Sequence, residues 1–143
     1  MTTSTPTSFE DALIADMRAN DGRVTSGPLA GHPLLVLTGR GAKSGEPRRT
    51  ILTWHRDGDD YVVAGTAGGS PTTPAWVHNL RAHPDVEIET GNRTFAARAT
   101  IVEGDERDRL WADHVAKLPW FGKYETKTSR RFPMVRLTPI DRA

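Results

Sequence analysis

The chain has 143 residues, of which 36% are hydrophobic, so it is long enough for one compact domain and too short for two. Its 19 basic and 18 acidic side chains nearly cancel, and a formal net charge of +1 provides no general attraction for nucleic acid or for an anionic membrane. The absence of cysteine excludes disulfides, thiolate metal sites and cysteine nucleophiles.

The sequence predicts a cytoplasmic protein without a transmembrane segment. No apolar run reaches the roughly 20 residues of a membrane span, and the opening MTTSTPTS lacks the charged and apolar parts of a signal peptide. We expect a disordered tail over residues 1–8 and a single domain over residues 9–143.

The first half of the chain predicts one helix and three strands. Ser8 is a suitable N-cap, and the apolar residues after it recur every four positions: Phe9, Leu13 and Met17. Segment 20–33 is rich in glycine and proline and favours turns. Strands are expected at 34–38, 49–56 and 61–64. A tight turn at 57–60 makes an antiparallel meander the simplest arrangement.

The second half begins with a flexible loop, GTAGGSPTTP, at 65–74. Pro74 suits the first turn of a helix that continues to about Ala82, and Thr72 or Thr73 would cap it. Two strands, 85–90 and 93–102, are then expected to form a hairpin that turns at Gly91 and Asn92.

A second amphipathic helix and a last strand complete the chain. Asp105 is the expected cap of this helix, and Pro119 ends it. Its apolar face contains Leu110, Trp111, His114, Val115 and Leu118. The last strand is expected at 133–138. Six short strands with few helices predict an antiparallel barrel with helices over its ends.

The stretch from Thr38 to Thr50, TGRGAKSGEPRRT, concentrates positive charge in a short loop. It carries one carboxylate, Glu46, and four cations: Arg40, Lys43, Arg48 and Arg49. A phosphate-binding P-loop needs glycine directly before its lysine and a helix after it, whereas here Ala42 precedes the lysine and a strand follows. The glycine spacing also excludes a dinucleotide fingerprint, and Ser44 lacks the surroundings of a nucleophile elbow. A solvated turn and a site for an extended anion both remain open.

We expect no metal site. The five histidines provide no pair at metal-ligand spacing on one predicted element, and His114 on an apolar helix face is typical of a core residue. The acidic residues gather in the turn at 57–60 and at the helix start at 103–108, where solvent exposure is the ordinary explanation.

Several motifs, taken together and in order, resemble the deazaflavin-dependent nitroreductase family of small split-barrel oxidoreductases. They are GRGAKSGEPRRTILTWHRDGDDYVV, GGSPTTPAWVHNLRAHPDVEIETG, GDERDRLW and YETKTSRRFPMVRLTP, within residues 34–139. The family pattern combines a GxKSG-type loop, an Arg-Thr strand, a glycine pair before a Pro-x-Trp-x-His-Asn-Leu helix, and a late tyrosine.

The resemblance implies a mainly β fold with flanking helices (α+β), a flavin-reductase-like split barrel of about six antiparallel strands. It also implies coenzyme F420 as cofactor, a deazaflavin with a phosphate and an oligoglutamate tail. The residues implied to meet the tail are Arg40, Lys43, Ser44, Arg48 and Arg49. Thr50 and Ile51 would run beside the ring. The remaining implied cofactor contacts are Thr66, Gly68, Gly69, Trp76 and Asn79.

Tyr124 matches the late tyrosine, and the resemblance implies a catalytic role in which it donates a hydrogen bond to a developing oxyanion. Packing against Trp120 is the alternative for this side chain. The chain departs from the family pattern at Ala67, where a lysine is frequent, and at Val77, where a tyrosine is frequent.

The implied activity is hydride transfer to a small-molecule acceptor, namely a quinone, a nitroaromatic or an activated alkene such as an enone. The alternatives are a non-catalytic module that binds this cofactor, a flavin or a haem, and a reductase of the same fold that uses flavin mononucleotide (FMN). Peripheral contact with a quinone held in a membrane is also implied. The chain would be a monomer or a homodimer.

Overall fold

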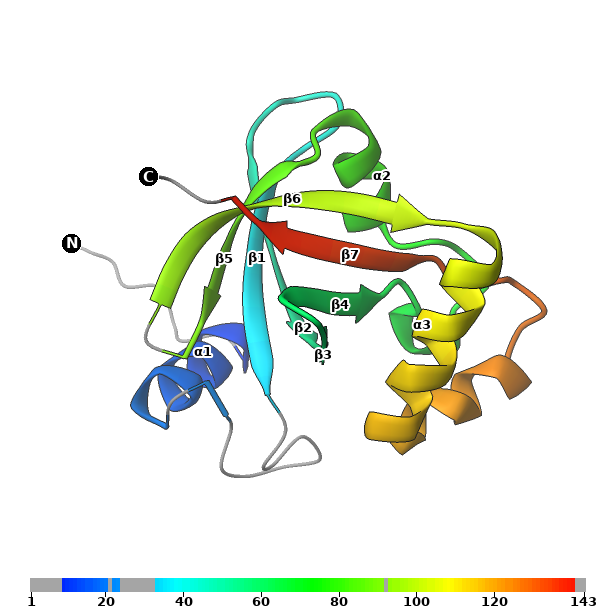
Figure 1. Cartoon of the computed structure of the whole chain (residues 1–143). Coiled ribbons are helices and arrows are strands. Elements are labelled where there is room, and N and C mark those ends of the chain that lie inside the picture. Colours follow the sequence, from blue (N-terminus) through cyan, green and yellow to red (C-terminus); the bar gives the residue numbers. More distant parts are fainter. Residues whose placement is uncertain (1–8, 21, 24–32, 92, 141–143) are drawn as a thin grey trace.

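The computed structural model describes residues 9–20, 22–23, 33–91 and 93–140, which form a curved antiparallel sheet with helices around it (Figure 1). The strands are β1 (Leu34–Arg40), β2 (Pro47–Thr53), β3 (His55–Asp57), β4 (Asp60–Ala64), β5 (Asp85–Thr90), β6 (Arg93–Val102) and β7 (Met134–Pro139). The helices are α1 (Phe9–Ala19), α2 (Ala75–Ala82) and α3 (Gly104–Lys117), with 3-10 helices η1 (Ala67–Gly69) and η2 (Pro119–Thr126). None of the described helices is long and apolar enough to cross a membrane.

The sheet curves into a barrel whose two edge strands are consecutive in the chain. Its strand order is β2-β1-β5-β6-β7-β4-β3, and the two edge strands, β2 and β3, are separated in sequence by Trp54 alone. The pairs β1–β2, β3–β4 and β5–β6 are antiparallel neighbours, as predicted. The predicted single strand over 49–56 is wrong. This segment changes partner at Trp54, from β1 to β4, and the sheet therefore has seven strands.

Apolar residues fill both faces of the sheet. Leu35 and Leu37 of β1 belong to a cluster inside the barrel, whereas Leu34 and Val36 pack under α1 with Ile14 and Met17. Successive residues of a strand point to opposite faces, so the continuous apolar run LLVL is buried on both sides. A third cluster lies between the sheet and the α3–η2 pair. The mainly β barrel with flanking helices is therefore confirmed.

Helix α2 closes one end of the barrel, because Leu80 and the half-buried Trp76 pack against the inner cluster. The predicted threonine cap of α2 is wrong: Pro74 occupies the N-cap and no side chain caps the helix. The fixed φ of proline, here −64°, suits an extended residue that leads into a helix.

Helices α1 and α3 differ from prediction in detail. Met17 is fully buried as predicted, Ile14 is also buried, and the predicted cap and the side chains of Phe9 and Leu13 lie outside the described residues. In α3 the predicted apolar face is confirmed, but Asp105 is in the first turn and Glu103 is the N-cap. The start comes earlier because Gly104 has a φ of +62° and turns the chain directly into the helix.

Candidate functional site

The basic loop between β1 and β2 is a tight, self-supported turn. The Gly41 amide donates to the Glu46 carbonyl at 2.8 Å, and the Gly45 amide donates to the Gly41 carbonyl at 2.9 Å. Gly45 has a φ of +71°, and a Cβ on Gly41 would lie 2.6 Å from Ser44 Oγ. The positive φ favours glycine at position 45, and a Cβ at position 41 would displace the Ser44 hydroxyl, so both glycines suit the shape of this loop.

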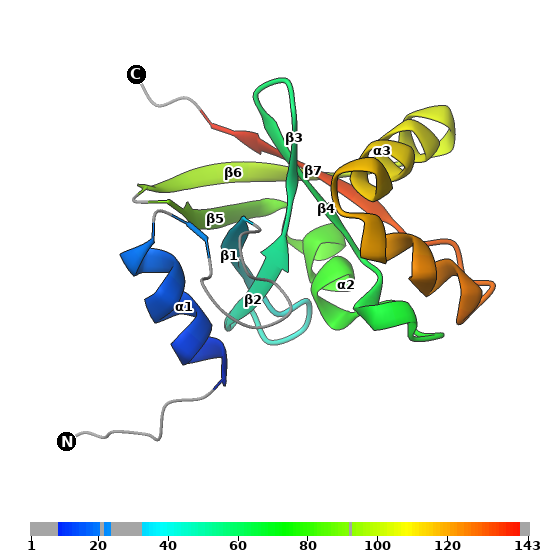
Figure 2. The same ribbon diagram turned by 90° about the horizontal axis from the view of Figure 1, so that it is seen from below.

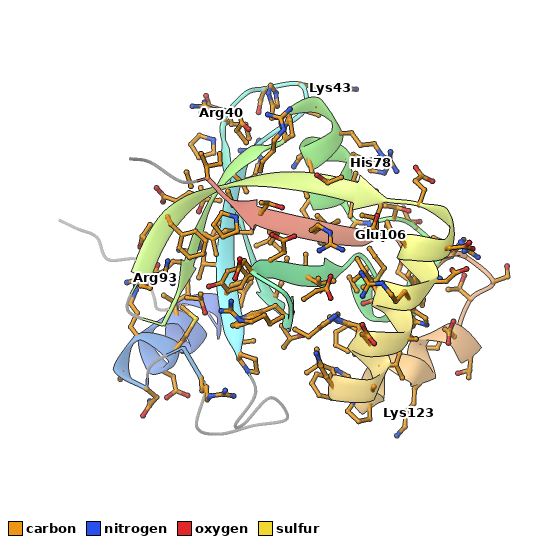
Figure 3. All side chains as sticks on the ribbon, in the orientation of Figure 1. Arg40, Lys43, His78, Arg93, Glu106 and Lys123 are labelled. Atoms are coloured by element: carbon orange, nitrogen blue, oxygen red, sulfur yellow. The ribbon has the colours of Figure 1, made fainter. Side chains whose placement is uncertain are left out.

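Three cations of this loop are exposed: Arg40, Lys43 and Arg48. Arg40 donates to the Gly45 carbonyl, and Arg48 donates to the Pro47 carbonyl and to Ser44 Oγ. Within the described part of the chain, none of these three side chains forms an ion pair. Figure 3 shows Arg40 and Lys43 at the outer edge of the molecule. The loop therefore presents cations with free N–H donors, which is the donor set that phosphate and carboxylate groups require.

A side-chain hydrogen bond holds the basic loop against helix α2. The Ala42 amide donates to Asn79 Oδ1 at 2.9 Å, and Asn79 is half-buried on α2. The structure therefore brings together two of the segments that the sequence singled out, and Figure 2 shows α2 beside the end of the β1–β2 pair. Asn79 uses its carbonyl oxygen in this contact and keeps its NH₂ group for another partner.

Thr50 and Ile51 occupy opposite faces of β2. Ile51 packs against the α1 cluster, opposite Val36 in the register, and Thr50 pairs with Leu37. Because successive strand residues alternate, only one of these two side chains can face a given ligand.

The glycine loop forms η1 and the turn around it. Thr66 is buried, and the Gly69 amide donates to its carbonyl at 2.9 Å. Gly69 has a φ of +88°, and Ala67, where a lysine was expected from the resemblance, has a φ of +48°. A left-handed alanine costs about 1 kcal/mol, so the loop is held in this shape by contacts elsewhere.

Arg130 provides those contacts. Its guanidinium donates to the carbonyls of Gly65, Thr66 and Ser70 at 2.9 to 3.1 Å and to Thr73 Oγ1 at 3.3 Å. Its Cζ also lies 4.8 Å from the Phe132 ring centroid. Burial lowers the pKa of this guanidinium from its ordinary value.

Sequence reasoning did not identify Arg130. It stands in the run SRRF beside Arg131, which is exposed and forms an ion pair with Asp108. Two adjacent residues of the same type carry no local signal that distinguishes a half-buried side chain that holds a loop from a surface charge.

Tyr124 lies on η2 beside the glycine loop. A Cβ on Gly69 would lie 3.3 Å from the Tyr124 carbonyl oxygen, so η1 and η2 are in direct contact. The Tyr124 ring meets Phe121 edge to face, with centroids 5.4 Å apart, and both it and Trp120 are partly buried against the same cluster. The structure thus pairs the basic loop with α2, and the glycine loop with η2.

The described residues contain no group of three histidine, aspartate or glutamate side chains that could hold a metal ion.

A family model described as F420H(2)-dependent quinone reductase matches residues 12–139 of the chain. An F420H(2)-dependent quinone reductase of Mycobacterium tuberculosis is 40% identical over 124 residues, which cover 85% of this chain and 83% of the relative.

Three solved structures show the same fold. An F420-H2 dependent reductase superposes with a TM-score of 0.67 at 32% identity, covering 73% of this chain and 93% of that one. A chain described as a domain-swapped dimer has a TM-score of 0.69 at 28% identity and covers 90% and 93%. A haem storage protein from Vibrio cholerae, with a TM-score of 0.56 at 20% identity and coverage of 90% and 89%, shares the fold alone.

Proposed function

The chain belongs to the F420H(2)-dependent quinone reductases, a family of F420-dependent reductases, and we propose that it passes a hydride from reduced coenzyme F420 to a quinone. The observation that carries the proposal is the match over residues 12–139, which includes the basic loop, α2, the glycine loop and η2. We include nitroaromatics and activated alkenes in this proposal as further hydride acceptors.

The donor set of the basic loop fits the anionic tail of the cofactor. We assign Arg40, Lys43, Ser44, Arg48 and Arg49 to the phosphate and carboxylates. The support is that these five side chains are exposed around a loop of defined shape, and that three of the cations lack an ion pair with a described residue. The Asn79 contact to Ala42 holds this loop in register with α2.

We assign the ring to the space bordered by β2, the glycine loop and α2. The proposed contacts are Thr50, Ile51, Thr66, Gly68, Gly69, Trp76 and Asn79. Thr66 and Gly68 would contribute backbone amides, and Asn79 its remaining NH₂ group. Gly69, whose own amide donates to the Thr66 carbonyl, would contact the ring through its other backbone atoms. Thr50 and Ile51 face opposite ways, so one would contribute its side chain and the other its backbone.

When bound, the reduced deazaflavin supplies a hydride to the acceptor. The chain has only to orient the two molecules, exclude water and stabilise the charge that develops on the acceptor oxygen. We propose that the Tyr124 hydroxyl donates a hydrogen bond to that oxygen, because Tyr124 lies on η2, whose backbone contacts the glycine loop at Gly69. A homodimer is part of the proposal, supported by the relative solved as a domain-swapped dimer.

A side-by-side titration with coenzyme F420 and with FMN tests the cofactor assignment. We expect the deazaflavin to bind more tightly. Tighter binding of FMN, with a flavin that copurifies with the protein, would contradict it.

Replacing Lys43 by alanine should weaken deazaflavin binding roughly 10- to 100-fold, which corresponds to one charge-assisted contact. The affinity of this variant should also depend less on salt. Fluorescence titration at two salt concentrations measures both effects. Lys123→Ala is the control, because Lys123 is exposed on η2, away from the basic loop (Figure 3). Equal affinities of Lys43→Ala and the wild type would remove Lys43 from the site.

Replacing Tyr124 by phenylalanine should lower kcat about a hundredfold with little change in deazaflavin affinity. The phenyl ring preserves the edge contact with Phe121, so the fold should be unaffected. Steady-state kinetics with a soluble quinone separates the two quantities. An unchanged kcat would show that Tyr124 has no catalytic role and contributes only to packing.

A further inference from the structure

A pocket lies at the other end of the barrel from the basic loop. It has a volume of about 450 Å³ and lies where the start of β1, the β3–β4 hairpin and the β5–β6 hairpin meet. Pro33 lines this pocket, and β1 runs from the next residue to Arg40 at the basic loop. Seven extended residues span about 20 Å, so the two sites are well separated. Figure 3 shows Arg93 and Lys43 at different ends of the molecule.

The wall of this pocket is basic and aromatic. Among its described lining residues are Arg23, Arg56, Arg93, Trp54 and Tyr61, and none of these lining residues is acidic. A volume of 450 Å³ is in the ordinary range for sites that bind small organic molecules.

Arg56 and Arg93 are held by rings and not by carboxylates. The Arg56 Cζ lies 5.0 Å from the Tyr61 ring centroid and 5.8 Å from that of Trp54, and its Nη2 lies 3.4 Å from the Tyr61 hydroxyl. The Arg93 Cζ lies 5.0 Å from the Phe95 ring centroid. Over the described residues, neither guanidinium forms an ion pair.

Three other exposed arginines are held by carboxylates instead. Arg18 pairs with Glu89, Arg98 with Asp85, and Arg109 with Asp57. A guanidinium that stacks on a ring keeps its N–H edge available for acceptors in its plane. Two such cations on one pocket raise its potential, and an anion between them would relieve their repulsion.

We propose that this pocket binds a small organic anion, whose carboxylate or phosphate group lies between the guanidinium groups of Arg56 and Arg93. The apolar part of the molecule lies against Trp54, which is half-buried. The site is separate from the proposed deazaflavin site and does not depend on that assignment.

NMR titration of the full chain with two probes, inorganic phosphate and 2-naphthoate, tests the proposal. The indole N–H signal of Trp54, assigned with Trp54→Phe, reports on the pocket wall. We expect saturable shifts at this signal with at least one probe. Tighter binding of 2-naphthoate identifies a carboxylate on an aromatic body, and tighter binding of phosphate identifies a phosphate group.

Three variants complete the experiment. Arg56→Ala with Arg93→Ala should weaken probe binding at least tenfold, or about one charge-assisted contact, and Arg98→Ala, the matched control on β6, should bind like the wild type. Arg56→Lys with Arg93→Lys keeps the charge and the fold but loses the guanidinium fork, so binding should be a few-fold weaker.

All three variants should bind the deazaflavin as the wild type does. Absence of saturation with both probes would overturn the proposal, as would equal affinities of the double alanine variant and the wild type. Loss of deazaflavin affinity in the double alanine variant would overturn the separation of the two sites.

Discussion

Replacing Arg130 by alanine is expected to lower the free energy of unfolding by about 2 to 4 kcal/mol and to weaken deazaflavin binding. Arg130 is the common donor to Gly65, Thr66 and Ser70, and the first two of these residues are buried. Without the guanidinium, their carbonyls lose a charged donor, and the left-handed conformation of Ala67 loses its support.

Arg131→Ala is the matched control for this variant. Arg131 is adjacent in sequence, exposed, and paired with Asp108 at the surface, so its loss should cost less than about 1 kcal/mol. Urea unfolding gives the stability of both variants, and fluorescence titration gives their cofactor affinity. Arg130→Lys should recover only part of either quantity, because one ammonium group cannot reach all four acceptors. Equal stability of Arg130→Ala and Arg131→Ala would show that the hydrogen bonds of Arg130 to the glycine loop do not stabilise the fold.

The chain is also expected to lose stability between pH 7 and pH 5 through a pair of buried histidines. His55 Nδ1 and His114 Nδ1 are 2.8 Å apart, and the two side chains are 4% and 0% exposed. Burial lowers the pKa of His55 to about 4 and that of His114 to about 3. In the neutral pair one Nδ1 carries a proton and donates a hydrogen bond to the other Nδ1. Protonation of both rings would bring two N–H donors face to face with no acceptor between them.

The sign of this pH effect on stability follows from which state of the chain binds more protons. In this pH range the unfolded chain binds protons on histidines that stay neutral in the folded chain, so the free energy of unfolding falls as the pH falls. With an unfolded pKa near 6.5, the loss from pH 7 to pH 5 is about 2 kcal/mol for each histidine.

Urea unfolding at a series of pH values measures this loss. The double variant His55→Leu with His114→Leu removes both partners together and should show a flatter pH profile. His78→Gln, on the exposed side of α2, should keep the wild-type profile. The same slope in the double variant and the wild type would contradict the assignment to this pair.

The strand pairs were largely predictable because local chemistry determines them. Apolar runs and glycine-containing turns identified β1, β4 and the β5–β6 hairpin to within about two residues. The break at Trp54 was not predictable, because the sequence on both sides keeps strand character while the hydrogen-bonding partner changes from β1 to β4. That change is a property of the closed sheet and not of the local sequence.

The candidate site was predictable as a set of segments more than as a geometry. The basic loop and the Trp76–Asn79 segment do lie together, but the contact that joins them, from Ala42 to Asn79, has no sequence signature. The opposite orientation of Thr50 and Ile51 follows from strand alternation. Arg130 was not predictable because only tertiary burial separates it from Arg131. The individual site residues remain predictions until the variants are measured.

Oxidation of reduced coenzyme F420 by a soluble quinone such as menadione tests the central claim most directly. The reaction is followed by the return of the visible absorbance of the oxidised deazaflavin. We predict a quinone-dependent rate that is proportional to protein concentration and that falls in the Tyr124→Phe variant. Tight deazaflavin binding with no oxidation across quinones, nitroaromatics and activated alkenes would contradict it and would indicate a protein that holds the cofactor without turnover.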